Sequence, residues 1–166
     1  MASKPYIILV GTDYSAHAAR AVRLAVREAS KRAHSQLHVV HVGRPDALAQ
    51  HGLMRLGGLG LDYRQNLLGP PRAERLAGAL ANLRVPHHVS THVHTLVGEP
   101  ASVLIELASE LGAQLLVVGT RSRRSVTRWA LGSVAETVVR RATCAVMVSG
   151  PRLQLAPERP PKLALS

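Results

Sequence analysis

The residues best suited to chemistry lie between an apolar run at 115–118 and a helical pattern that starts at Ser133. The run ends at Gly119, a polar loop follows, and Gly132 directly precedes Ser133. Backbone N–H groups at a helix N-terminus have no partner within the helix, and the helix dipole places partial positive charge there. Glycines allow that backbone to approach an anion closely. This stretch therefore predicts a phosphate site.

The loop between these glycines is rich in arginine, with positive side chains at Arg121, Arg123, Arg124 and Arg128. Cations at this position would strengthen a phosphate site. The stretch also has a purely structural interpretation, which the sequence leaves open. In that interpretation Gly132 and Ser133 only start a helix, and the arginines form a solvated surface.

The elements that must position this loop follow an alternating order. Apolar runs and period-two alternation predict strands at 6–11, 37–42, 89–97, 115–118 and 145–148. Helical periodicity predicts helices at 18–29, 73–83, 101–111 and 133–141. Strands that alternate with helices imply an α/β fold, in which helices cover both faces of a parallel sheet.

Candidate ligand residues follow the predicted strands. Asp13, Val42, Gly98 and Gly119 each come just after a strand, so we expect them along one rim of the sheet. A carboxylate at Asp13 can accept hydrogen bonds from ribose hydroxyls. Two alternatives remain: Asp13 caps the first helix, and the Gly98 segment is a turn followed by a helix start.

The length of 166 residues favours one domain, which we place at 1–149. Glycines and a proline pair at 44–71 indicate a surface insertion, whose composition permits mobility and a short helix at most. The proline-rich, basic segment at 150–166 is expected to be a disordered tail. The apolar runs are too short to cross a membrane or to serve as a signal peptide.

The net charge of +11, with 18 arginines among the 21 cationic residues, favours anionic partners such as nucleotides or nucleic acid. Only three tyrosines and one tryptophan are present, which disfavours stacking on single-stranded nucleic acid. The single cysteine, Cys144, cannot form an intramolecular disulfide, in keeping with a cytoplasmic location.

Three histidines, His88, His92 and His94, are separated by even numbers of residues, so they are expected on one face of the strand at 89–97. His88 directly precedes that strand. His92 and His94 are close enough for one metal ion, but the sequence supplies no cysteine or carboxylate nearby. We therefore expect histidines on a solvent-facing edge strand, and no metal site.

Taken together, three segments resemble the universal stress protein family. They are YIILVGTDYSAHA with Asp13, VGEP at 97–100, and VVGTRSRRSVTRWALGSVAETVVRRATCAVMV at 117–148. ATP-binding members show glycine, two residues, glycine, nine residues, and then Gly-Ser or Gly-Thr. Gly119 and the Gly132–Ser133 pair match this spacing, and Ser122 replaces the middle glycine.

The resemblance implies an open five-stranded parallel sheet with strand order 3-2-1-4-5 and about four helices. This is the Rossmann-like, adenine nucleotide alpha hydrolase-like architecture. It also implies an adenine nucleotide, ATP with or without Mg²⁺, near Asp13 and the backbone of Val42. The phosphates would be bound by the residues from Gly119 onwards in the predicted set. The full predicted set of binding residues is Thr12, Asp13, Val42, Gly98, Gly119, Arg121, Ser122, Gly132, Ser133 and Val134.

The resemblance further implies a stress-response regulator that forms a homodimer through the strand at 144–148. The sequence places no catalytic residues, so we expect at most slow ATP hydrolysis. Two alternatives remain. Ser122 favours a member that has lost nucleotide binding and acts through protein contacts, and the high charge favours an arginine-driven nucleic-acid binder.

Overall fold

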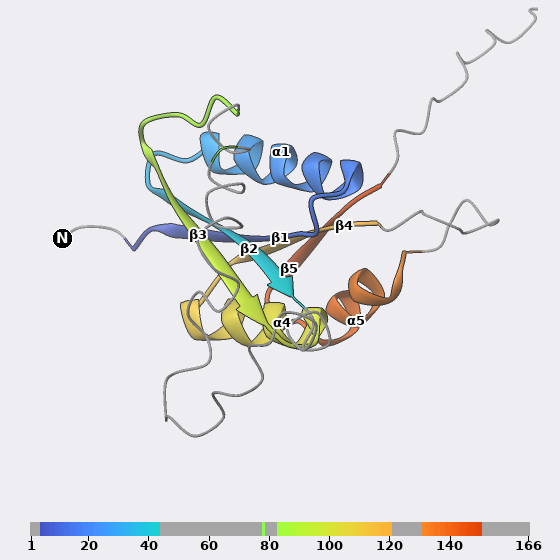
Figure 1. Ribbon diagram of the computed structural model, residues 1–166. Coiled ribbons are helices and arrows are strands. Elements are labelled where there is room, and N and C mark those ends of the chain that lie inside the picture. The colour runs from blue at the N-terminus through green and yellow to red at the C-terminus, as the bar shows by residue number, and fades with distance from the viewer. Residues whose placement is uncertain (1–3, 44–77, 79–82, 121–130, 151–166) are drawn as a thin grey trace, which may run out of the picture.

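The computed structural model describes residues 4–43, 78, 83–120 and 131–150. These residues build a five-stranded parallel sheet with the strand order β3-β2-β1-β4-β5 (Figure 1). The order implied by the resemblance is therefore confirmed. The strands are β1 (Tyr6–Thr12), β2 (Ser35–Gly43), β3 (Val89–Val97), β4 (Leu115–Gly119) and β5 (Ala145–Ser149).

Helices cover both faces of the sheet. Helix α1 (Ala16–Ser30) lies on one face, and α4 (Pro100–Leu111) and α5 (Ser133–Arg141) lie on the other (Figure 1). Consecutive residues Ile8, Leu9 and Val10 have no exposed surface. Ile8 and Val10 pack in the cluster under α1, and Leu9 packs in the opposite cluster. Burial on both faces explains why the central strands are continuous apolar runs rather than alternating ones.

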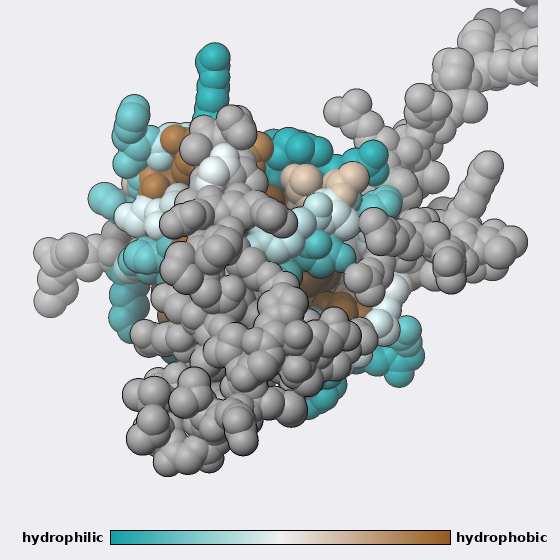
Figure 2. Space-filling view, in the orientation of Figure 1, coloured by the Kyte–Doolittle hydropathy of each residue, from teal (hydrophilic) through white to brown (hydrophobic). Residues whose placement is uncertain are grey.

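Local sequence sets where the helices begin and end. The Ser15 hydroxyl accepts a hydrogen bond from the Ala18 N–H at 3.1 Å and caps α1. Glu99 caps α4, where Pro100 occupies the first turn. Gly112 ends α4 in the left-handed conformation, with φ of 64°. The outer surface of α1 carries hydrophilic side chains, as the sequence pattern predicts (Figure 2).

Every predicted strand is present, each with bounds within two residues of those expected. Three of the four expected helices are described. The expected helix at 73–83 lies outside the described residues except for Gly78 and Leu83. The insertion at 44–71 and all of the tail after Gly150 also lie outside them. Among the described helices, none is long and apolar enough to cross a membrane.

Gly119, at the end of β4, lies against the first turn of α1. A Cβ added to Gly119 would be 3.0 Å from the His17 carbonyl oxygen and 3.2 Å from the Ala18 nitrogen. Both atoms belong to helix backbone, which cannot move aside as the end of a side chain can. The absence of a side chain at Gly119 therefore permits the close approach of β4 and α1.

A second feature of the sheet is a group of three histidines, His38 on β2 and His92 and His94 on β3. His38 Nδ1 lies 2.9 Å from His94 Nε2, and the His38 ring stacks on His92 with centroids 4.6 Å apart. Because β3 is an edge strand, the expected location is confirmed. His92 is exposed as expected, but the expectation was wrong for His94, which is half-buried against β2.

The surroundings of these histidines disfavour their charged forms. Burial, followed by the neighbouring His94 and His92, lowers the pKa of His38 to about 4. Burial and His92 also lower the pKa of His94. Within the described residues, no group of three or more His, Cys, Asp or Glu side chains is arranged to hold a metal ion. His38 and His94 therefore pack between β2 and β3 as rings whose charged forms are disfavoured, and His92 stacks on His38.

Replacing Gly119 with alanine is expected to lower the free energy of unfolding by roughly 1–3 kcal/mol, because the new methyl group overpacks the α1 backbone. Urea denaturation measures this loss. Gly150→Ala is the control, since a Cβ there meets nothing within 4 Å. Equal stability of the two variants would contradict the close approach.

The free energy of unfolding is expected to fall as the pH decreases from about 6.5 towards 4. The unfolded chain takes up a proton on His38 in this range, whereas the folded protein excludes it, so acidification favours unfolding by on the order of 2 kcal/mol. Urea denaturation at stepped pH measures the slope. His38→Asn keeps a polar atom near the Nδ1 position but does not titrate, so its slope should be shallower. Identical slopes would show that His38 does not contribute.

Candidate functional site

A cleft of about 500 Å³ opens at the carboxyl ends of β1, β2 and β4. It lies at the topological switch point, where the chain leaves β1 towards α1 on one face and β4 towards α5 on the other. Among the described residues, its walls include Thr12, Asp13, Tyr14, His17, His41, Val42, Gly119, Leu131, Gly132, Ser133 and Val134. The structure thus brings together seven of the ten predicted binding residues.

Asp13 lies at the turn between β1 and α1 and has a structural role there. Its Oδ1 atom accepts a hydrogen bond from the Ser15 N–H at 3.0 Å. Tyr14, between them, has a φ of 62°, a left-handed conformation that is uncommon for a side chain of its size. The cap of α1 is Ser15 rather than Asp13, so the alternative in which Asp13 itself caps the helix is wrong.

Two aromatic rings that the sequence analysis missed lie beside Asp13. The rings of Tyr14 and His41 have centroids 4.5 Å apart and are tilted by 48°. His41 Nδ1 lies 2.9 Å from the Thr12 carbonyl oxygen. Because a carbonyl only accepts, Nδ1 must carry the proton, which leaves Nε2 as an acceptor in the neutral ring. With Val42, these rings form the end of the cleft that is suited to a flat heterocycle.

The opposite end of the cleft is the start of α5. Gly132 occupies the N-cap position with a φ of 80°, and among the described residues no side chain caps this helix. By contrast, Ser15 caps α1 and Glu99 caps α4. The N–H groups of the first turn of α5 therefore remain available at the cleft, together with the exposed Ser133 hydroxyl. This arrangement suits an anion, as the sequence predicts.

The structure separates Gly98 from the other candidates. Its N–H donates to the Gly43 carbonyl oxygen at 2.9 Å, and it does not line the cleft. A φ of 151°, and a Cβ position only 2.7 Å from Val103 Cγ2, account for a glycine there. The neighbouring Pro100 does line the cleft. The interpretation as a turn and helix start therefore describes Gly98 best.

Two predicted binding residues, Arg121 and Ser122, lie outside the described residues. The last described residue before them is Thr120, which is buried. Its N–H and its hydroxyl both approach the Ser149 carbonyl oxygen, at 3.0 and 3.3 Å. These contacts fix the point at which the loop leaves the sheet beside the cleft.

His17 is the third residue that the sequence analysis missed. It lies in the first turn of α1 and lines the cleft. Its Nδ1 atom is buried and has no hydrogen-bond partner among the described residues. An unpaired buried polar atom costs roughly 1–3 kcal/mol, so such atoms call for an explanation. The available signal in the sequence was a histidine two residues after Ser15, at the start of the predicted helix.

Comparison with known proteins agrees with this architecture. The family model described as the universal stress protein family matches residues 6–149. Universal stress protein Rv2623 of Mycobacterium tuberculosis is 33% identical over 142 residues, which are 86% of this chain and 44% of the relative. Universal stress protein YxiE of Bacillus subtilis is 28% identical over 144 residues, 85% of this chain and 96% of the relative. The chain thus spans less than half of Rv2623 but nearly all of YxiE.

Solved structures share the fold. A universal stress protein in complex with cAMP superposes with a TM-score of 0.59 at 22% identity, covering 89% of this chain and 98% of that one. The universal stress protein from Archaeoglobus fulgidus in complex with dAMP superposes with a TM-score of 0.56 at 23% identity. This match covers 87% of this chain and 97% of that one. With the strand order, the cleft at the switch point and the match over 6–149, these findings show that the chain belongs to the universal stress protein family.

Proposed function

We propose that this protein is a nucleotide-responsive regulator that binds an adenine nucleotide such as ATP in the cleft between Asp13 and the start of α5. The observation that carries the proposal is the uncapped N-terminus of α5 in a cleft that also contains a carboxylate. A nucleotide needs both features, because its ribose offers hydroxyl donors and its phosphates offer negative oxygens.

The ribose and base would occupy the end formed by β1 and β2. Oδ1 of Asp13 accepts from Ser15, and a carboxylate has about four lone-pair sites in total. In the proposed complex the Asp13 carboxylate would hold the turn and would also accept a hydrogen bond from a ribose hydroxyl. The base would lie near the Val42 backbone, beside the paired rings of Tyr14 and His41.

The phosphates would occupy the other end, against Gly119 and the first turn of α5. Gly132, Ser133 and Val134 supply backbone N–H groups there, and Ser133 adds a hydroxyl. Arg121 and Ser122 belong to the same predicted set through the glycine spacing. If Mg²⁺ accompanies the nucleotide, it would neutralise phosphate charge.

Adenine-nucleotide chemistry is supported by the related structures in complex with cAMP and dAMP. The preference for ATP rests on the Gly119 and Gly132–Ser133 spacing. Asp13 is the single carboxylate among the described cleft residues, and the turn before α1 already engages it. This favours binding and signalling over rapid hydrolysis. We place this activity in the cytoplasm, in keeping with the single cysteine of the chain.

Calorimetric titration with ATP is expected to show binding that Asp13→Asn weakens by about tenfold. The amide retains an acceptor for the Ser15 N–H, so the turn survives, but it loses the charge and part of the acceptor capacity for ribose. Glu106→Gln is the matched control, because Glu106 is exposed on α4 and does not line the cleft.

A folded wild-type protein that binds no ATP at millimolar concentration would refute this assignment. If Ser122→Gly then restored binding, the chain would be a member that has lost nucleotide binding through that serine and acts through protein contacts.

We also propose a homodimer that forms through β5. This strand is at one edge of the sheet, and its residues Val146, Met147 and Val148 are only half-buried. An apolar edge with open backbone groups is suited to pairing with a second copy. The segment at 144–148 includes Cys144, whose thiol is half-buried and has its pKa raised by burial.

Sedimentation analysis is expected to give twice the 17.8 kDa mass of the chain. Ala145→Lys, at an exposed position of β5, should shift the protein towards the monomer, because charge on an edge strand opposes pairing. Ala33→Lys, at an exposed position after α1, is the control and should remain dimeric. If Ala145→Lys left the dimer unchanged, pairing through β5 would be wrong.

A further inference from the structure

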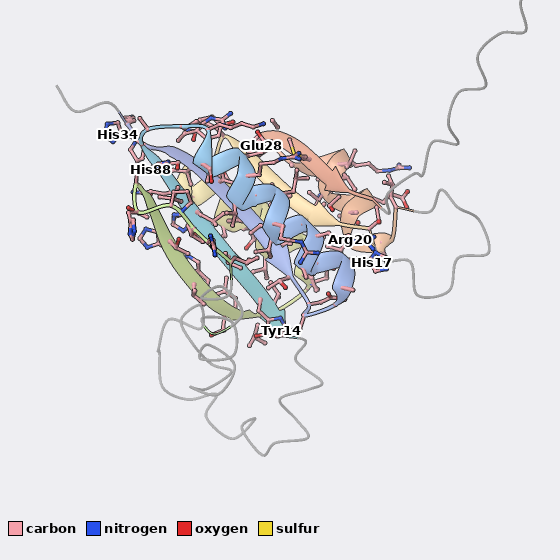
Figure 3. The ribbon with its side chains drawn as sticks, turned by 90° about the horizontal axis from the view of Figure 1, so that it is seen from above. Tyr14, His17, Arg20, Glu28, His34 and His88 are labelled. Carbon is pink, nitrogen blue, oxygen red and sulfur yellow. The ribbon has the colours of Figure 1, made fainter. Side chains whose placement is uncertain are left out.

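His17 lies in the part of the cleft where β4, α1 and α5 meet. It is the second residue of α1, and its carbonyl oxygen is the nearest atom to the Cβ position of Gly119. Figure 3 shows its side chain leaving the start of α1 on the side of β4 and α5, at the opposite end of the helix from His34. His17 therefore belongs to the phosphate end of the proposed site.

The ring of His17 has no structural hydrogen bond to maintain. Its Nδ1 atom is buried without a partner among the described residues, and its Nε2 atom is not one of the buried unpaired atoms there. The other histidine of the cleft differs, because His41 Nδ1 is engaged by the Thr12 carbonyl oxygen. His17 thus offers a hydrogen-bond donor that the fold itself does not use, close to a helix start that is also uncapped.

A phosphate oxygen is the ligand atom that matches these groups. It accepts hydrogen bonds and never donates them, and imidazole can donate whether neutral or charged. A donor beside a helix N-terminus gains strength when its acceptor is anionic. We propose that His17 donates through Nε2–H to the phosphate chain of the bound nucleotide and so determines the preference for nucleotides over nucleosides.

This inference rests on the proposed nucleotide site and adds a residue to it. A role in phosphate recognition has a clear signature: the loss of His17 should weaken phosphorylated ligands selectively. A role limited to packing would weaken adenosine and ATP equally, because both share the base and ribose.

The test is calorimetric titration of the full chain with ATP and with adenosine. His17→Ala is expected to weaken ATP about tenfold and to change adenosine less than twofold. His17→Gln places an amide donor near the Nε2 position and should recover most of the ATP affinity, whereas His17→Ala cannot. His34→Ala removes an exposed histidine far from the cleft and should match the wild type for both ligands. Thermal unfolding confirms that each variant is folded.

The outcomes separate this inference from the proposed function. Binding of ATP by His17→Ala with wild-type affinity would overturn the role of His17 while leaving the site in place. An equal loss of ATP and adenosine, or a failure of His17→Gln to recover ATP affinity, would also overturn it. If the folded wild type bound neither ligand, the nucleotide site would be refuted, and the role of His17 with it.

Discussion

The close approach of β4 to the first turn of α1 is the constraint on which the cleft depends. At Gly119 there is room for a hydrogen atom but not for a side chain, because the His17 carbonyl oxygen would lie 3.0 Å from a Cβ. The two strands β1 and β4 are neighbours, yet the chain leaves them towards opposite faces. The cleft therefore lies at the switch point between these two strands, the place where ligands of open α/β sheets bind.

The N-termini of α1 and α5, which both lie beside this cleft, differ in how their backbone N–H groups are hydrogen-bonded. The turn before α1 satisfies its own backbone through Ser15 and Asp13, so the polar groups there hold the fold together. The start of α5 has a glycine at the cap and no side-chain partner. A helix start without a cap costs stability unless water or a ligand satisfies it. The start of α1 is thus engaged in structural hydrogen bonds, whereas the start of α5 has no side-chain cap among the described residues, as the proposed phosphate site requires.

The fold could be predicted from the sequence because its signals are local. Apolar runs such as 6–11 and 115–118 require burial on both faces, and the alternation with helices then dictates a parallel sheet. The site was predicted only in part. Asp13 and Ser133 follow or precede recognisable elements, but His17, Tyr14 and His41 enter the cleft through packing between distant segments. His94 illustrates the same limit, since its partner His38 is 56 positions away in the sequence and no periodicity indicates the pair.

Asp13 shows why structural and ligand-binding interpretations of one residue need not compete. Its Oδ1 atom accepts from the Ser15 N–H, and a carboxylate with about four lone-pair sites can accept more than one hydrogen bond. The same contact holds the turn that begins α1, and the first turn of α1 carries His17 into the cleft. The carboxylate at one end of the site and the imidazole at the other are thus fixed by a single stretch of five residues. A change in this turn would therefore move both ends of the cleft together, whereas the start of α5 could change independently.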